Sequence, residues 1–273
     1  MGRGARAALA ALWLAGGMLP AAGGGEIDGP AIASRGGCPG CELHHAELRS
    51  VDLAGADFSG ANLREALFKN SNLTRASFRD AYLVRAEIEK ARLLGADFTG
   101  AQLRGADLEK SDATGARFVE ADLRRADLAE AILENADFTG ADMRGAMLRR
   151  ADLTGAVLRK VKLEDGDLER VRSEGADFSG ARMPYADMDR IKARGANFRN
   201  AEMRGVSLAS ADLTGADLRG ADLKRAHLRR TNLSGADLRG VTGLDEERLI
   251  RACGDAATKL PEGFTIRPCA RDP

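Results

Sequence analysis

The chain has 273 residues, and its 41 basic and 41 acidic side chains give a formal net charge of zero at pH 7. This balance argues against a nucleic-acid-binding protein, which carries an excess of Lys and Arg on its binding face. Aromatic residues make up only 4% of the chain while 44% is hydrophobic. Since most of the hydrophobic residues are Ala and Leu, we expect a thin, continuous core with no globular centre.

Residues 1–23 are predicted to be a secretory signal peptide. Arg3 and Arg6 precede an apolar run, Ala7–Leu19, and small residues suitable for cleavage follow at 20–23. This is the three-part form of a secretory signal, and the run is short for a membrane span. No Cys stands at the cleavage site, so no stable membrane anchor is expected. We therefore expect a secreted or periplasmic protein, with a disordered Ala/Gly-rich tail as the alternative interpretation.

Residues 24–40 are predicted to form a linker and an N-terminal cap that ends in Cys38-Pro39-Gly40-Cys41. A Cys-x-x-Cys pair can be a disulfide, half of a metal site or a thiol-exchange centre. Zinc could use both cysteines with His44 or His45, but the spacing is tight and no second Cys/His pair follows. A redox centre would need a βαβ context, which this segment lacks. A capping disulfide between Cys38 and Cys41 is the preferred interpretation.

Residues 41–240 repeat every five residues, forty times, without an insertion or deletion. A typical unit is Ala56-Asp57-Phe58-Ser59-Gly60, which reads small, polar, large apolar, polar, polar. On an α-helix five residues advance about 500°, and no apolar stripe would form. On a flat strand the odd spacing would alternate the large residue between the two faces. The chain must therefore turn once per unit, with the first and third residues pointing inward.

A second period of twenty residues shows how many units make one coil. Seven of the eight phenylalanines in the repeat region occupy the central position at multiples of this spacing, and Leu158, Leu218 and Leu238 complete the series. Four units per coil predict a square cross-section in which these rings stack, adding about 0.5–1.5 kcal/mol per pair beyond burial. The phenylalanine column consists of Phe58, Phe78, Phe98, Phe118, Phe138, Phe178 and Phe198.

Gly occupies the last position of 17 of the forty units. A corner with unusual backbone angles favours Gly. Because Arg, Lys, Glu and Asn fill many of the other last positions, we do not expect a positive φ at every corner.

Residues 161–195 are the least regular stretch of the repeat. Drift in a tolerant solenoid is the preferred interpretation, and a binding site is the alternative. In the second case Pro184 and Tyr185 would form an interaction surface.

These units resemble those of the pentapeptide-repeat family, which read as variants of Ala-(Asp/Asn)-Leu-x-x. The resemblance covers about 200 of the 273 residues. It implies an all-β fold, a right-handed quadrilateral β-helix. Forty units would make about ten coils, a rod of about 48 Å at about 4.8 Å per coil. Fold alone does not imply function.

Residues 241–273 are predicted to form a C-terminal cap. Asp245 is suited to N-cap a short helix, 246–252, whose two leading Glu residues favour the helix dipole. Cys253 and Cys269 are expected to form a disulfide, because the N-terminal cysteines lie some ten coils away. This bond would close a loop of 17 residues, counting both cysteines. The residues expected to cover the last coil are Leu249, Ile250, Phe264 and Ile266. This tail resembles one found on exported bacterial members of the family.

No catalytic constellation is apparent, so a non-enzymatic protein without cofactors is expected. The three His are split between His44 and His45 at one end and His227 at the other. The recurrent Asp residues, such as Asp57 and Asp97, are interpreted as a solvated face. A carboxylate ladder that binds cations is the alternative.

Three function classes remain open. The first is an exported structural or protein-interaction rod, a monomer or an end-to-end dimer with an unknown protein partner. The second is suggested by the resemblance: some family members mimic DNA and bind type II topoisomerases. That role needs a strongly acidic surface, whereas no column of this repeat has more than a few net charges. The third is a metal- or thiol-binding end cap. Nucleic-acid binding is disfavoured by the neutral charge and the scarcity of exposed aromatics, mainly Tyr82 and Tyr185.

Overall fold

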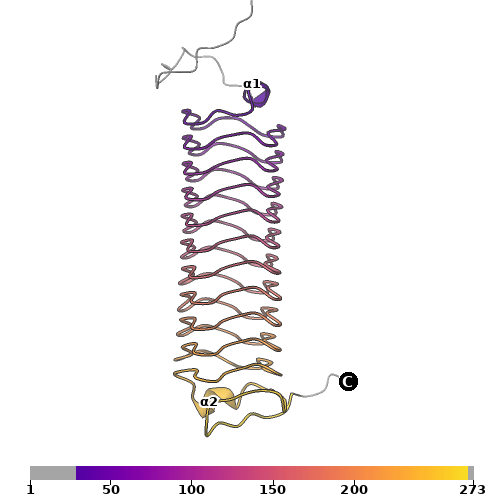
Figure 1. Cartoon of the computed structure of the whole chain (residues 1–273), viewed down its shortest axis with the longest axis vertical. Coiled ribbons are helices and arrows are strands. Elements are labelled where there is room, and N and C mark those ends of the chain that lie inside the picture. Colours follow the sequence, from indigo (N-terminus) through magenta and orange to yellow (C-terminus); the bar gives the residue numbers. More distant parts are fainter. Residues whose placement is uncertain (1–28, 270–273) are drawn as a thin grey trace, which may run out of the picture.

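A computed structural model describes residues 29–269, so the predicted signal peptide, 1–23, lies outside the described residues. The repeat winds into a single β-helix (Figure 1). A short helix, α1 (Gly29–Ser34), lies at one end and another, α2 (Glu246–Leu249), at the other. The coils pair through isolated parallel bridges, with no longer strand among these residues. From the Gly37–Asp57 bridge to the Asp222–Thr242 bridge, each bridge joins residues twenty positions apart, such as Asp57 and Ser77.

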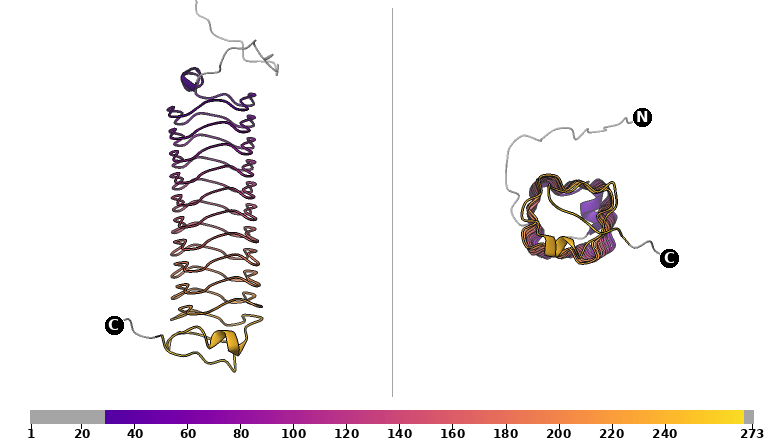
Figure 2. Two further views of the ribbon diagram at one scale, coloured as in Figure 1. Left: turned by 180° about the vertical axis from the view of Figure 1, so that it is seen from behind. Right: turned by 90° about the horizontal axis from the view of Figure 1, so that it is seen from below.

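Backbone hydrogen bonds between successive coils hold this ladder together. The N–H of Phe58 donates to the carbonyl of Ser77 at 2.8 Å, and the N–H of Ser77 donates back to Ala56 at 2.9 Å. The corner N–H of Gly60 donates to Arg79 at 2.8 Å. Most units repeat this set with the adjacent coils, so buried backbone groups are paired as they must be away from water. Viewed along the axis, the coils superimpose in a four-sided outline (Figure 2).

The core is a narrow column filled by the first and third residues of the units. Phe78, Phe98, Phe118 and Phe138 are fully buried, and their rings stack 4.8–4.9 Å apart within 3° of parallel. Phe178 and Phe198 form a second stack at 4.9 Å. Leu158 interrupts the series of rings between the two stacks. The predicted inward pair thus fills the core of the rod.

All forty last positions of the units have a positive φ, and 23 of them are not Gly. The expectation that not every corner would have a positive φ is wrong. Arg125, for example, has a φ of 56°, and its N–H donates to Arg144 on the next coil at 3.0 Å. Left-handed backbone disfavours a residue with a Cβ by about 1–2 kcal/mol. The repeated inter-coil hydrogen bond requires the same geometry at every corner, so tertiary structure overrides local preference.

The N-terminal cap lies in the segment predicted as linker and cap. Helix α1 was not anticipated from the sequence. Its Ile32 is buried against the core of the β-helix. This side chain covers the open end of the column, which a solenoid needs at its terminal coil.

At the other end, α2 begins as predicted but is shorter. Asp245 caps it, because its Oδ1 accepts the N–H of Arg248 at 2.8 Å. The helix ends at Leu249 rather than at residue 252 because the chain rejoins the ladder, where the carbonyl of Arg251 accepts the N–H of Arg230 at 2.7 Å. Ile250 is 68% exposed, so its predicted role in covering the last coil is wrong. The other three predicted residues contact the core, namely Leu249, Phe264 and Ile266.

Candidate interaction surface

The commonest second residue of a unit is Asp, and its side chain fixes the local turn. Asp57 Oδ1 accepts the N–H of Ser59 at 2.9 Å, and Asp127 Oδ1 accepts the N–H of Ala129 at the same distance. Asp and Asn favour such turns because their side chains reach the backbone two residues on. The interpretation of these residues as a solvated face therefore missed a structural role. The alternation of Asp with a turn every five residues could have revealed it.

Many of these Asp residues also bind Arg. The guanidinium of Arg124 donates to both oxygens of Asp122, at 2.7 and 2.6 Å, and Arg144 binds Asp142 in the same way. The hydrogen bonds from Arg124 lower the pKa of Asp122 despite its partial burial. A second pattern joins successive coils, because an Arg at the fourth position often reaches the Asp eighteen residues on. Examples are Arg79–Asp97, Arg149–Asp167 and Arg194–Asp212.

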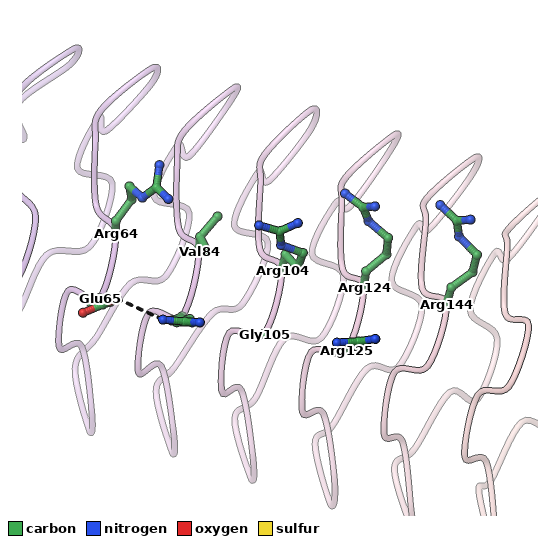
Figure 3. Close-up of a pocket in the computed structure, with 9 residues that line it drawn as sticks. Arg64, Glu65, Val84, Arg104, Gly105, Arg124, Arg125 and Arg144 are labelled. Carbon is green, nitrogen blue, oxygen red and sulfur yellow. Dashed lines mark ion pairs between the residues drawn. The ribbon is translucent and has the colours of Figure 1, made fainter.

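One side of the rod carries a shallow groove lined mostly by arginine (Figure 3). This basic groove consists of Arg64, Glu65, Val84, Arg85, Arg104, Gly105, Arg124, Arg125 and Arg144. Four of the arginines stand at the fourth position of their units and form a row along the rod axis (Figure 3). The groove therefore presents a line of positive charge rather than a point charge.

Half of these arginines have no acidic partner. Arg85 lies 3.7 Å from Glu65, and Arg124 and Arg144 bind the Asp residues of their own units. Within residues 29–269, Arg64, Arg104 and Arg125 form no ion pair.

The neighbouring side of the same coils is acidic. This acidic patch consists of Glu87, Glu89, Asp107, Glu109, Asp127 and Glu130, with Lys90 and Lys110 among them. Burial raises the pKa of Asp107, and the charges of Asp127, Glu89 and Glu109 raise it further. The net charge of a whole column hides these two regions, because charges elsewhere in the column offset them. A count over four successive coils would have separated the basic groove from the acidic patch.

The predicted interaction residues lie on the same side of the coil as the basic groove. Tyr185 is 64% exposed and lies five coils of twenty residues beyond Arg85. Its ring covers Gly205 on the next coil, where an added Cβ would lie 2.7 Å from the ring. Pro184 beside it is half-buried. Tyr82 is 42% exposed, and its unit, 81–85, belongs to the groove, so both tyrosines of the chain are on this side.

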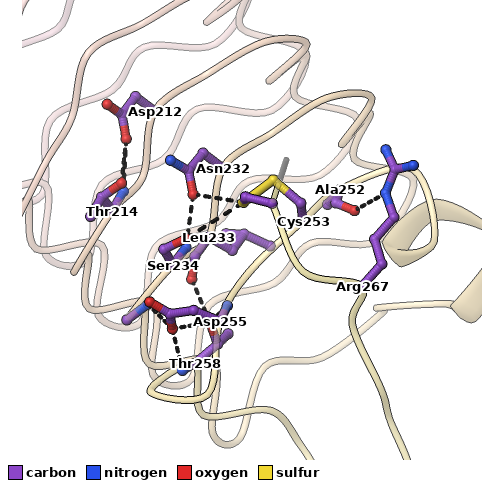
Figure 4. The surroundings of a disulfide bond; sticks show 12 residues. Asp212, Thr214, Asn232, Leu233, Ser234, Ala252, Cys253, Asp255, Thr258 and Arg267 are labelled. Atoms are coloured by element: carbon purple, nitrogen blue, oxygen red, sulfur yellow. Dashed lines mark hydrogen bonds between the residues drawn. A yellow bond between two sulfur atoms is a disulfide. The ribbon is translucent and has the colours of Figure 1, made fainter. Parts of the chain in front are cut away.

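The four cysteines lie in two pairs at the two ends. Cys38 and Cys41 are paired with their Cα atoms 5.6 Å apart. Cys253 and Cys269 are paired at a sulfur–sulfur distance of 2.05 Å (Figure 4). Arg267 beside the second pair donates to the carbonyl of Ala252 at 3.0 Å, which ties the tail to the cap.

The other candidate residues do not assemble into a site. His44 and His45 lie side by side, with ring centroids 5.6 Å apart, and His45 is 3.4 Å from Glu65. His227 is exposed near the opposite end. Across residues 29–269 no group of three or more His, Cys, Asp or Glu is placed to hold a metal ion. The same part of the chain contains no helix of sufficient length and hydrophobicity to span a membrane.

Comparison with known proteins identifies matching family profiles along the repeat. The profile described as Pentapeptide repeats matches residues 101–140, 136–172, 174–208 and 207–242, and that described as Pentapeptide repeat region matches 41–118. No curated protein matches the chain.

The similar solved structures include two pentapeptide repeat proteins and a drug-resistance protein. HetL, a pentapeptide repeat protein of the cyanobacterium Nostoc involved in heterocyst differentiation regulation, is 33% identical over 84% of this chain and 92% of its own, with a TM-score of 0.36. A pentapeptide repeat protein from the Arabidopsis thaliana thylakoid lumen is 29% identical over 50% and 77%, with a TM-score of 0.33. QnrB1, a plasmid-mediated fluoroquinolone resistance protein, is 15% identical over 67% and 88%, with a TM-score of 0.45.

Proposed function

The chain belongs to the pentapeptide-repeat family, and we propose that it is a non-enzymatic structural and protein-interaction rod, exported to the cell envelope or beyond. The family implies a right-handed β-helix. Its finer form here is a quadrilateral coil of about ten turns with a short α-helical C-terminal cap. Proteins of this family are generally non-catalytic repeat proteins, which agrees with the proposed role.

The long ladder of inter-coil hydrogen bonds is the observation that carries this proposal. It begins at Cys38, whose N–H donates to Asp57, and is still present at Leu238, whose N–H donates to Lys259. Each coil contacts only its neighbours, so the rod holds outward side chains in straight rows at a rise of about 4.8 Å. The interior is filled by apolar side chains, which leaves the outer faces as the place for recognition.

The outer faces also provide features typical of protein interfaces. Arg and Tyr are enriched at binding hot spots, where they combine apolar area with hydrogen-bonding groups. The basic groove and the two exposed tyrosines lie on one side of this rod. A protein partner that covers this side is the simplest role for it.

Two features support export, although the segment that would direct it lies outside the described residues. Arg3, Arg6 and the apolar run that follows have the form of a secretory signal. The four cysteines lie in pairs with none left over, and such pairing is favoured in oxidising compartments.

The two alternative classes receive less support. A DNA mimic needs an acidic surface, whereas the net charge is zero and one side carries the basic groove. A metal- or thiol-binding end cap would need free thiolates, and Cys38 is paired with Cys41.

Fractionation of the native host, followed by crosslinking and pull-down from each fraction, tests the proposal. We expect a form shortened by about the length of a signal peptide in the envelope or medium, crosslinked to a protein. A variant that lacks residues 1–23 should remain in the cytoplasm and serves as the control. An uncleaved protein bound to the nucleoid would overturn export and favour the topoisomerase alternative.

A further inference from the structure

We propose that the basic groove binds an extended acidic peptide segment of a protein partner. This inference rests on the proposed role as an interaction rod and deepens it by naming the face and the chemistry of the partner. It follows from the charges that this chain leaves unpaired, from their spacing and from what surrounds them.

The unpaired arginines at the fourth position of the groove lack an available Asp partner. Elsewhere an Arg at the fourth position pairs with the Asp eighteen residues on, as Arg159 does with Asp177. For Arg64 the corresponding residue is the neutral Tyr82. Arg104 faces an Asp122 whose two oxygens already accept hydrogen bonds from Arg124.

The third unpaired arginine is isolated within its own column. Gly105 and Gly145 precede and follow Arg125 at the corner position of the adjacent coils. The Cγ atom of Arg125 lies 3.6 Å from the position that a Cβ of Gly145 would occupy. No neighbour in this column can therefore neutralise its guanidinium.

Carboxylates are the groups that this groove already binds. Asp122 and Asp142 each receive two hydrogen bonds from one guanidinium. Planar guanidinium groups bind carboxylates well because two N–H donors match two oxygens. An incoming Asp or Glu side chain would bind Arg104 or Arg64 by the same geometry.

The spacing fits a linear ligand. Arg64 and Arg144 are four coils apart, which is about 19 Å at about 4.8 Å per coil. An extended peptide rises about 3.4 Å per residue and directs every second side chain to one side, so about six residues cover this distance with three carboxylates facing the groove. Three carboxylates equal the number of unpaired arginines.

The surroundings favour a single narrow chain over a wider anionic partner. The acidic patch occupies the next side of the same coils, so a flat anionic membrane would meet both charges at once. Single-stranded nucleic acid binds by stacking bases on aromatic rings, and within residues 29–269 Tyr82 is the one exposed Tyr, Phe or Trp next to the groove.

Fluorescence anisotropy with the purified protein and a labelled ten-residue peptide of alternating Glu and Ser tests the proposal. We expect binding that weakens with added salt. The double variant Arg104→Gln/Arg125→Gln should weaken it about threefold to tenfold, the loss of two exposed charge pairs. The variant Val84→Arg should tighten binding, because it fills the gap in the arginine row between Arg64 and Arg104.

A matched double variant controls for overall charge. Arg75→Gln/Arg199→Gln removes the same two charges from the fifth and fourth positions of units on other sides, where neither arginine forms an ion pair with the described residues. This control should bind the peptide as the unmodified protein does. Equal loss in both double variants would overturn the proposal, because it would show an unspecific response to charge.

Further experiments distinguish the acidic peptide from other ligands of the basic groove. Binding of phosphatidylglycerol vesicles in preference to the peptide would overturn the proposal in favour of a membrane. Concentration-dependent self-association that Arg104→Gln/Arg125→Gln abolishes would overturn it in favour of the acidic patch of a second copy. If the pull-down captures a protein partner equally with Arg104→Gln/Arg125→Gln, this inference fails while the proposed interaction role stands.

Discussion

The inner wall and the outer surface of this rod obey different rules, although they alternate along the same five-residue unit. On the inner wall nearly every unit has a small first residue and a large apolar third residue. Where Ser173 and Ala193 replace the large residue, Val171 and Ile191 replace the small one, and all four are fully buried. The volume lost at one position is recovered two residues earlier, as close packing demands.

On the outer surface the same backbone accepts nearly any side chain. In 23 units the corner residue is not Gly. These residues have almost the same φ although they differ in size as much as Ser50 and Tyr185 do. Shape is therefore held from inside, which leaves the surface free to change its charge without changing the coil. The basic groove and the acidic patch can lie on adjacent sides of the same coils for this reason.

Replacing Phe118 with Ala tests the inner wall with the largest expected effect. Its ring lies 4.9 Å from Phe98 and 4.8 Å from Phe138, so truncation removes two stacking contacts and leaves a cavity. We expect a loss of about 3–5 kcal/mol in the free energy of unfolding, measured by urea denaturation. The outer-surface control Arg124→Ala should lose less than about 1 kcal/mol. Equal losses would contradict the distinction between wall and surface.

The two cysteine pairs allow the same measurement of stability at the two ends of the rod. Opening the Cys253–Cys269 loop with Cys253→Ser should cost about 3 kcal/mol on the loop-entropy account, and opening the four-residue Cys38–Cys41 loop with Cys38→Ser should cost about 2. Melting of oxidised protein and of each variant measures the difference. Mass spectrometry that finds four free thiols in exported protein would remove the basis of this prediction.

The sequence predicted the inner wall well because a five-residue period admits few folds. The Phe residues spaced by twenty led directly to the coil, and the backbone bridges show the same interval. The corners were mispredicted because Arg and Glu do not favour a positive φ on their own, and only the inter-coil hydrogen bond imposes it. Helix α1 was missed because a six-residue segment held by one buried Ile32 has no periodic signal.

The candidate site was only partly predictable. Tyr185 could be chosen from its irregular unit, but the basic groove could not be recognised from column sums. It depends on which arginines have an Asp within reach, and Arg124 and Arg104 differ in this although both stand at the fourth position. Pairing of this kind is a property of rotamers and distances.

Exchanges at the corners separate backbone strain from packing. Gly115 has a φ of +66° and open space around its missing Cβ, so Gly115→Ala introduces strain without a clash. We expect it to cost about 1 kcal/mol. Ser210, with a φ of 59°, provides the reverse test, since Ser210→Gly should relieve strain and raise stability by less than about 1 kcal/mol. Thermal melts of both variants measure this. If Gly115→Ala is neutral, the ladder rather than the residue sets the energy of the corner.

The smallest predicted effects come from two aspartates with opposite pKa shifts on the outer surface. Hydrogen bonds from Arg239 lower the pKa of Asp237 to about 2, so its charge stabilises the fold above about pH 4, and this contribution is lost as the pH falls toward 2. Asp237→Asn should therefore cost less than about 1 kcal/mol at pH 7, since solvent screens the pair. The cost should vanish in acid.

Replacing Asp107 should change the free energy of unfolding in the opposite direction. Burial and neighbouring carboxylates raise its pKa, so the folded state binds the proton more tightly than the unfolded chain, and ionisation at neutral pH lowers stability. Asp107→Asn keeps an oxygen for the N–H of Glu109, which Asp107 Oδ1 accepts at 2.9 Å. We expect a gain of a few tenths of a kcal/mol at pH 7, on the scale of exposed charge interactions, that disappears below about pH 4. Urea denaturation of both Asn variants between pH 3 and 7 measures the two effects. Shifts of the same sign at pH 7 would mean that the acidic patch has no more local repulsion than the paired surface around Asp237.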